Sequence, residues 1–167
     1  MNKDLFYKIL WALPVIFAIH NGEELPQLEN WTNEHLADKS FAFLRELYSF
    51  HSLAFAMIML TVVVTVVVIL EYKLRNKLTF TLTMLSACLL LINGLTHIVQ
   101  SMIFQSYMPG LISAVLLLIP YMSFVLYLSM KANRIRLKTI GLYLVISVIV
   151  MVPIIFIFLI LSRWVIR

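Results

Sequence analysis

The sequence of 167 residues is 62% apolar, has a mean hydropathy of +0.98 and carries only 13% charged residues, about half the charged share of a soluble domain. Such a chain cannot cover its surface with groups that water solvates, so the composition excludes a water-soluble globular protein and indicates an integral membrane protein. The net charge of +5 is explained by basic residues that set the orientation of a membrane protein and that also attract anionic membrane lipids. It gives no support to nucleic-acid binding.

Five apolar segments follow one another along the chain, at residues 5–19, 53–70, 78–104, 111–130 and 140–161. Most of them reach the roughly 20 residues that a helix needs to cross a bilayer. The first is short, but a helix that continues through Glu24 would span. A signal peptide is the alternative for this segment, although the lack of a small-residue cleavage site favours an uncleaved helix. We therefore expect an all-α polytopic membrane helix bundle of about five transmembrane helices, in a single transmembrane domain over residues 1–167.

Basic residues predict the side of the membrane that each loop occupies. The loops after the second and fourth segments are basic, and the positive-inside rule puts both in the cytoplasm. Lys3 and Lys8 put the N-terminus there too, so we expect a plasma-membrane protein with a cytoplasmic N-terminus. The loop 23–46 holds six of the eight acidic residues and suits the outer side. Arg163 and Arg167 would then lie outside, against the rule, which leaves the side of the C-terminus open.

A polar cluster of His20, Glu23 and Glu24 ends the first segment. An imidazole and two carboxylates are costly to bury at a membrane edge, and ionisable groups in such places usually serve a function. If the helix continues through Gly22, the three stand at i, i+3 and i+4 on one side of it.

The long first loop belongs to the same side of the membrane. Between Trp31 and His51, aromatic and aliphatic residues alternate with charges, which indicates an interfacial amphipathic helix leading into the second segment. His51 lies at the level of the polar cluster, but His35 and His51 taken singly are explained more simply as interfacial hydrogen-bonding residues.

The third segment carries a second polar face. Asn93 and His97 are four residues apart and Gln100 follows three later, so all three project from one face of a helix. At 1.5 Å per residue, His97 lies about 28 Å from the inner end of its segment, and His20 and Glu24 lie at about 22 and 28 Å in theirs. Because the two clusters reach the same depth near the outer surface, we expect His20 and His97 to face each other.

A turn follows the third segment, where Pro109 and Gly110 suit the two central positions of a type II turn. An outer hairpin turn with Tyr107 in the aromatic belt explains this stretch, and a lid or substrate rim over the polar cluster is the alternative. Inside apolar segments, proline removes a backbone donor and favours a kink. Three residues are of this kind: Pro14, Pro120 and Pro153.

Three short patterns thus occur in order: HxxEE at residues 20–24, NxxxH at residues 93–97 and YxPG at residues 107–110. In a small membrane protein this ordered set resembles the HXXEE-motif family, over the chain from His20 to at least Gly110. The resemblance supplies no substrate, but it implies that the motif residues matter: His20, Glu23, Glu24, Asn93, His97, Tyr107, Pro109 and Gly110.

Two imidazoles with carboxylates and no cysteine suit Zn²⁺, or else a non-haem Fe or Mn ion. We expect His20, His97 and one glutamate, Glu24 or Glu23, to be ligands. The other glutamate would act as general base, and Asn93 would position a ligand or the water. The leading hypothesis is a metal-dependent membrane hydrolase acting on a lipid or other apolar small molecule near the outer leaflet.

Two alternatives stay open. A metal-free His–Glu pair could move a proton between carbons of an apolar substrate, as an isomerase does. A non-catalytic protein that binds a ligand or metal in the membrane would show the same residues. A transporter or channel is disfavoured because the inner halves of the segments offer only hydroxyl groups. The oligomeric state is not predicted.

Overall fold

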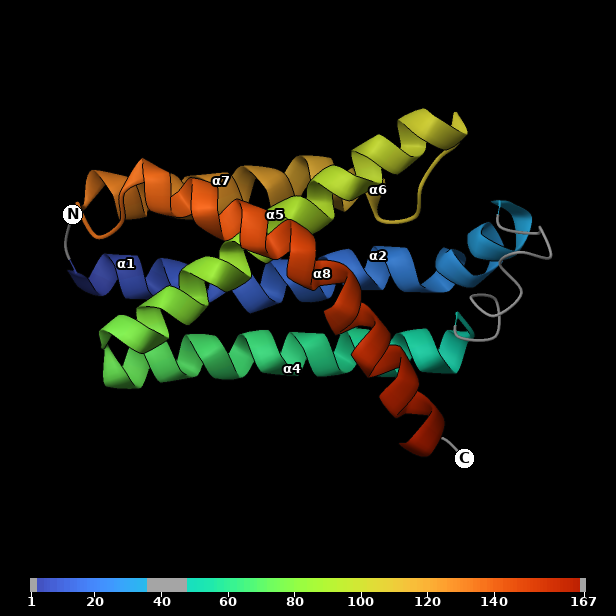
Figure 1. Cartoon of the computed structure of the whole chain (residues 1–167), viewed down its shortest axis with the longest axis horizontal. Helices are drawn as coiled ribbons and strands as arrows, with labels where there is room; N and C mark the ends of the chain where they lie inside the picture. Colours follow the sequence, from blue (N-terminus) through green and yellow to red (C-terminus); the bar gives the residue numbers. More distant parts are fainter. Residues whose placement is uncertain (1–2, 36–47, 166–167) are drawn as a thin grey trace.

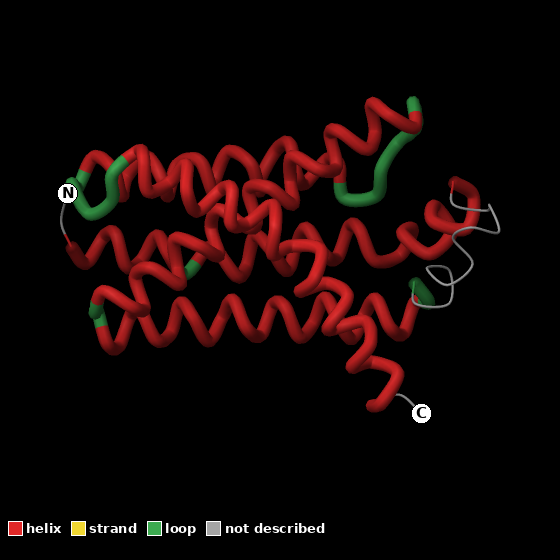
Figure 2. The backbone as a smooth tube through the Cα atoms, viewed as in Figure 1, coloured by secondary structure: helices red, strands yellow, loops and turns green. Residues whose placement is uncertain are grey.

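The computed structural model describes residues 3–35 and 48–165, and within them the chain is helical with short turns and no strand (Figures 1 and 2). The expected all-α bundle is confirmed. Most of the amphipathic helix expected between Trp31 and His51 falls on residues 36–47, outside the described residues. The elements in chain order are α1 (Lys3–Leu10), α2 (Ala12–His35), α4 (Phe50–Leu74), α5 (Lys77–Phe104), α6 (Leu111–Ser113), the π-helix η2 (Ala114–Leu118), α7 (Ile119–Lys131) and α8 (Leu137–Val165).

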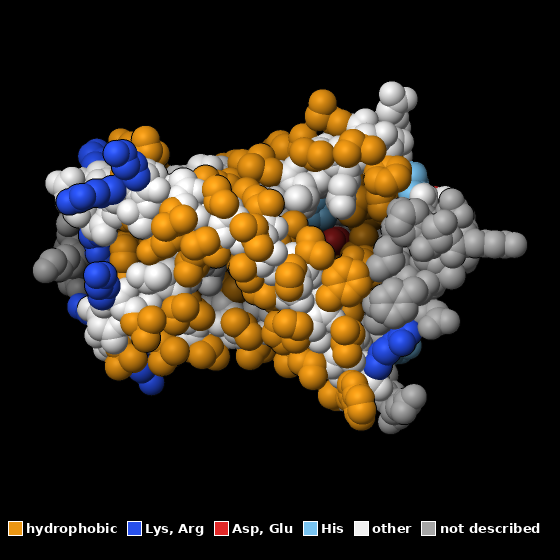
Figure 3. Space-filling model, viewed as in Figure 1, with side chains coloured by type: hydrophobic (Ala, Val, Ile, Leu, Met, Phe, Trp, Pro, Cys, Tyr) orange, Lys and Arg blue, Asp and Glu red, His pale blue; other side chains and the backbone are white. Residues whose placement is uncertain are grey.

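Among residues 3–35 and 48–165, four helical stretches are long and apolar enough to cross a membrane, namely α4, α5, the continuous run Leu111–Lys131 and α8. Their outward faces carry large apolar side chains such as Met102 and Leu116. Figure 3 shows an apolar surface on which most of the visible Lys and Arg side chains gather at one end. These features are compatible with an integral membrane protein. The first expected helix is not one of these four, because α2 continues from its apolar part into polar residues. Even so, α1 and α2 lie end to end alongside α4 (Figure 1).

The second helix is much longer than the apolar segment that begins it. α2 runs on through Gly22 and Glu24, as expected, and ends only at His35. Hydropathy falls where the polar cluster begins, whereas the glutamates and leucines that follow are good helix formers and carry the helix on. The same helix therefore holds the polar cluster in regular geometry.

Prolines accompany three irregularities of the helices. Pro14 has no N–H to offer the carbonyl of Leu10, and α1 ends at that residue, before the turn at Trp11. Pro120 is the second residue after η2, where the wider π-helical turn interrupts the α-helical pattern. Pro153 lies near the middle of α8, where Figure 1 shows that helix bending.

Buried side chains form two apolar clusters that hold the bundle together. The larger one, with Leu13, Met84 and Met122, joins α1, α2, α4, α5, α7 and the first part of α8. The smaller one, with Trp31 and Leu159, joins α2, α4 and α8 to the turn before α6. The π-helix η2 contacts both α2 and α5, so the two helices that carry the polar clusters meet around it.

An ion pair between a buried glutamate and a more exposed arginine lies at the basic end of the bundle. Glu71 is fully buried and accepts hydrogen bonds from Oγ1 of Thr79 at 2.6 Å and from Nη2 of Arg134 at 3.3 Å. Arg134 also donates to the hydroxyl of Tyr7 and lies over the ring of Phe6. The local sequence does not predict this ion pair, because Arg134 lies 63 residues from Glu71 in the chain.

Candidate functional site

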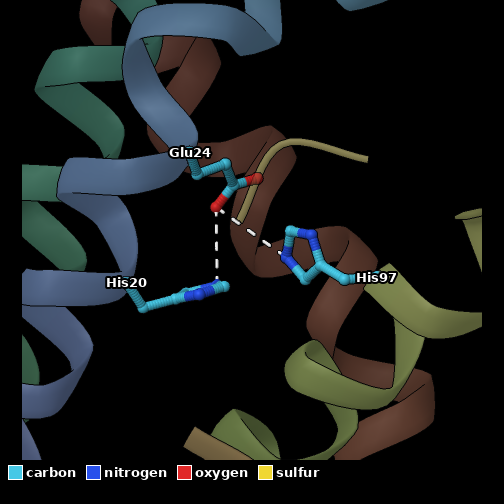
Figure 4. A group of neighbouring side chains, drawn as sticks. All are labelled: His20, Glu24 and His97. Atoms are coloured by element: carbon cyan, nitrogen blue, oxygen red, sulfur yellow. Dashed lines mark ion pairs between the residues drawn. The ribbon is translucent and has the colours of Figure 1, made fainter. Parts of the chain in front are cut away.

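Three polar side chains from two helices converge at one point (Figure 4). His20 and Glu24 stand one turn apart on α2, and His97 comes from α5. Oε2 of Glu24 lies 3.7 Å from Nε2 of His20 and 3.9 Å from Nε2 of His97. The two imidazole rings are nearly perpendicular, with 4.8 Å between their centroids. All three residues are buried, and neither histidine is more than 2% exposed.

Both ring nitrogens of His20 have further partners. Nδ1 is 3.0 Å from Oγ of Ser113, and Nε2 is 3.1 Å from Oδ1 of Asn93. In one tautomer, Nε2–H donates to Asn93 and the Ser113 hydroxyl donates to Nδ1. In the other tautomer, Nδ1–H donates to Ser113, whose hydroxyl donates to the carbonyl of Gly110 at 3.3 Å. In the second tautomer Nε2 carries a lone pair, as a metal ligand requires, and the Asn93 amide would have to turn, because its Oδ1 lies where that lone pair points.

The turn after α5 covers this group. It is the predicted type II turn, with Gly110 at φ 85° and ψ −4° and a hydrogen bond of 3.0 Å from Leu111 N to Met108 O. A Cβ on Gly110 would lie 2.9 Å from Cε1 of His20, 3.1 Å from Cε1 of His97 and 3.3 Å from Cβ of Glu24. Both the positive φ and the close approach to the imidazoles therefore require glycine here.

Glu23 points to a different set of partners from Glu24. Its Oε1 accepts from the Tyr107 hydroxyl at 2.5 Å and from Ile112 N at 3.1 Å, and its Oε2 accepts from Ser113 N at 2.7 Å. Partial burial, the hydrogen bond to Glu23 and the negative charge of that carboxylate raise the pKa of Tyr107 to about 12, so its hydroxyl stays a donor at neutral pH. Glu23 thus ties α2 to the turn and to the start of α6, which is the arrangement of a positioning residue.

A cavity of about 260 Å³, which we call the site cavity, adjoins the three residues and is lined by Glu24, His97, Asn93 and Gln100 among mostly apolar neighbours. Figure 3 shows red carboxylate atoms and pale-blue histidine atoms at the bottom of a hollow in the apolar face that α8 crosses. Two buried nitrogens of lining residues, Nε1 of Trp31 and Nδ1 of His97, make no hydrogen bond within the described residues. Polar side chains are among the residues that line the site cavity, so it can take a ligand with a polar part.

The other residues that the sequence predicted for the site do not belong to the converging group of three. Gln100 lines the site cavity without being one of the three converging residues. His51 is exposed at the start of α4, with its ring against Phe50. His35 stacks on Trp31, and its Nδ1 lies 3.0 Å from the carbonyl oxygen of Trp31.

Two residues of the site were not anticipated. Ser113 bonds His20, and Asn21 donates to Oγ1 of Thr61 at 2.9 Å, which attaches α2 to α4 beside the site. Asn21 is an unspecified position of HxxEE, and Ser113 follows YxPG, so a search for motif letters passes over both. The sequence offers one signal for Asn21, its position inside the polar cluster between His20 and Glu23.

The donor set fits a divalent metal ion. Two imidazoles and one carboxylate form the His₂Glu set of several catalytic zinc sites, and their donor atoms lie within 4.8 Å of one another. Tetrahedral zinc, with bonds of about 2.1 Å, holds neighbouring donors roughly 3.4 Å apart. Small side-chain rotations would close that difference. The backbone of Pro109 lies beside the His97 ring, although Nδ1 of His97 makes no hydrogen bond of good geometry.

A family model described as "Protein of unknown function with HXXEE motif" matches residues 11–125. This range contains the three short patterns and also Ser113 and Asn21. Comparisons with curated proteins and with solved structures give no match. Function must therefore be inferred from the geometry of the site.

Proposed function

We propose that this chain, which belongs to the HXXEE family, is a metal-dependent integral membrane enzyme, a hydrolase that acts on a lipid or another apolar small molecule. His20, Glu24 and His97 would hold a divalent ion, with Zn²⁺ favoured over Fe or Mn. The observation that carries the proposal is the convergence of three buried donor atoms within 4.8 Å, beside a cavity that two of these residues line.

Electrostatics supports an ion at this position. Glu24 is enclosed with two imidazoles, and a buried carboxylate without a full counter-charge is costly. A divalent cation would supply positive charge and keep both imidazoles neutral as ligands. The Ser113 to Gly110 hydrogen-bond chain can hold His20 in the tautomer that leaves Nε2 free.

Each residue of the site can be given a role. When bound, a Zn²⁺ ion supplies Lewis acidity and brings a water molecule to a pKa of about 7. Asn93 has its amide beside Nε2 of His20 and can orient a ligand or that water. Glu23 is engaged by three donors in the turn, so we assign it positioning and assign proton acceptance to the second oxygen of Glu24.

We place the site toward the outer leaflet of a plasma membrane, with the N-terminus in the cytoplasm. The supporting observation is the gathering of Lys and Arg side chains at the end of the bundle opposite the polar cluster (Figure 3). The substrate would then come from the lipids of that leaflet.

A metal-free acid–base enzyme is the second candidate. One observation favours it, since both nitrogens of His20 already have hydrogen-bond partners at 3.0 and 3.1 Å without an ion. In that case His20 and Glu24 would exchange a proton with a carbon acid of an apolar substrate. A protein that binds a ligand at this site without turnover would share the same geometry.

Metal analysis separates these candidates. The protein, purified in detergent without chelators, should carry close to one zinc per chain, or take it up when Zn²⁺, Mn²⁺ or Fe²⁺ is supplied. His20→Ala and His97→Ala should each lower metal content at least tenfold, whereas His51→Ala, an exposed histidine outside the site, should not. Hydrolysis of a panel of acyl and phosphate esters in micelles should be lost with chelator and restored with metal. A protein that binds none of the three metals would overturn the proposal.

A further inference from the structure

A second cavity, of about 350 Å³, lies beside the site cavity among α2, α4, α5 and α8, and we call it the deep cavity. The two cavities are direct neighbours, since they share five lining residues: Phe17, Leu60, Asn93, Met151 and Ile155.

The two spaces differ in chemistry. Of the residues that line the deep cavity, only Ser86, Asn93 and Ser147 are polar, and Asn93 stands at the junction with the site cavity. The site cavity holds the carboxylate of Glu24 and the imidazole of His97. A molecule that fills both spaces must therefore be polar at one end and apolar over the rest.

The lining of the deep cavity extends along the helices. On α5 it runs from Asn93 to Leu82, which is about 16 Å along the helix axis. An apolar cavity does not hold water stably, so an apolar chain is the occupant that matches its lining and its extent along the helices.

We propose that the deep cavity binds the single apolar chain of an amphiphilic substrate whose polar head lies at His20, Glu24 and His97. The inference rests on the proposed function for the role of the head group. The chain enters sideways from the bilayer through the hollow of Figure 3, where the polar atoms are visible from an apolar face.

Photolabelling tests the position of the chain. The probes are two hexadecyl glycerol ethers, which a hydrolase cannot cleave, with a diazirine either at the chain end or next to the glycerol. In the protein in nanodiscs, the chain-end probe should label residues around Ser86 and Val150, and the head-end probe should label residues around His97 and Met108. An excess of unlabelled hexadecyl glycerol should reduce both by at least fivefold.

Filling variants give the decisive comparison. Ser86→Phe and Val150→Phe each place a ring in the deep cavity from a different helix and should reduce chain-end labelling there at least fivefold, while an octyl probe still labels the site cavity. Ser123→Phe is the matched control, because Ser123 is exposed on α7 and lines neither cavity, and it should change nothing. Labelling confined to outward-facing residues, or equal in all variants, would overturn the inference.

The same labelling with His97→Ala keeps the two proposals separable. Deep labelling that persists in this variant while wild-type protein binds no metal would retain the chain site and remove the metal enzyme. Metal binding by the wild-type protein without any labelling of the deep cavity would retain the metal enzyme and remove the chain site.

Discussion

Gly110→Ala probes whether the turn and the converging histidines form one unit. The substitution puts a side chain on a residue with φ 85°, which costs about 1–2 kcal/mol for a residue other than glycine. The new Cβ would also lie 2.9 Å from Cε1 of His20, closer than real Cβ contacts. The His20 ring cannot move aside freely, because Ser113 and Asn93 hold its two nitrogens. Forced repacking of this kind costs a further amount of about 1–3 kcal/mol.

We therefore expect Gly110→Ala to lower the free energy of unfolding by about 2–5 kcal/mol and to reduce metal affinity at least tenfold. Stability would be measured by reversible unfolding in mixed micelles, and affinity by competition with a zinc-sensitive dye. Gly22→Ala is the matched control, since a Cβ there meets nothing within 4 Å on a helix, and it should be neutral or stabilising by up to about 1 kcal/mol. If both variants behave alike, the turn does not shape the site.

Three further variants test other contacts with the same unfolding assay. Arg134→Met leaves the fully buried carboxylate of Glu71 without its positively charged partner and should destabilise by about 3–5 kcal/mol, and a loss below about 1 kcal/mol would show that the pair contributes little. Glu23→Gln removes the charge that three donors share and should cost about 1–3 kcal/mol, more than Tyr107→Phe, while leaving metal bound; loss of metal instead would make Glu23 a ligand. Gly94→Ala puts a Cβ 2.8 Å from the isoleucine that begins α7 and should destabilise by about 1–3 kcal/mol, and a neutral result would show that α5 and α7 can separate.

Part of the site follows from local geometry alone. The rise and period of a helix are properties of the backbone, so the shared face of Asn93 and His97 and the equal depth of His20 and His97 could be predicted from spacing. The type II turn at Pro109 and Gly110 could be predicted as well, because only glycine among common residues accepts its second central position easily.

Other features depend on packing between segments far apart in the chain. Whether Glu23 or Glu24 turns toward His97 is decided by the turn, which brings Tyr107 and two backbone N–H groups to Glu23 from 84 to 90 residues away. The bond between Glu71 and Arg134 and the shape of the deep cavity have the same origin. Helix periodicity predicts which residues share a face, but not how neighbouring segments pack against that face. The spacing could therefore name Glu23 and Glu24 as candidate ligands, but could not choose between them.

The spacing of HxxEE gains a physical explanation from this arrangement. At about 100° per residue, His20 and Glu24 differ by about 40° around α2 and share the face toward His97. Asn21 and Glu23 lie about 160° apart on the two flanks of that face. On one flank Asn21 donates a hydrogen bond to Thr61 of α4. On the other, Glu23 accepts hydrogen bonds from Tyr107 in the turn and from the backbone N–H of Ser113 in α6. A single helical turn therefore presents two candidate ligands and fastens itself on both sides, so that neither ligand can rotate away without breaking a hydrogen bond to a neighbouring element.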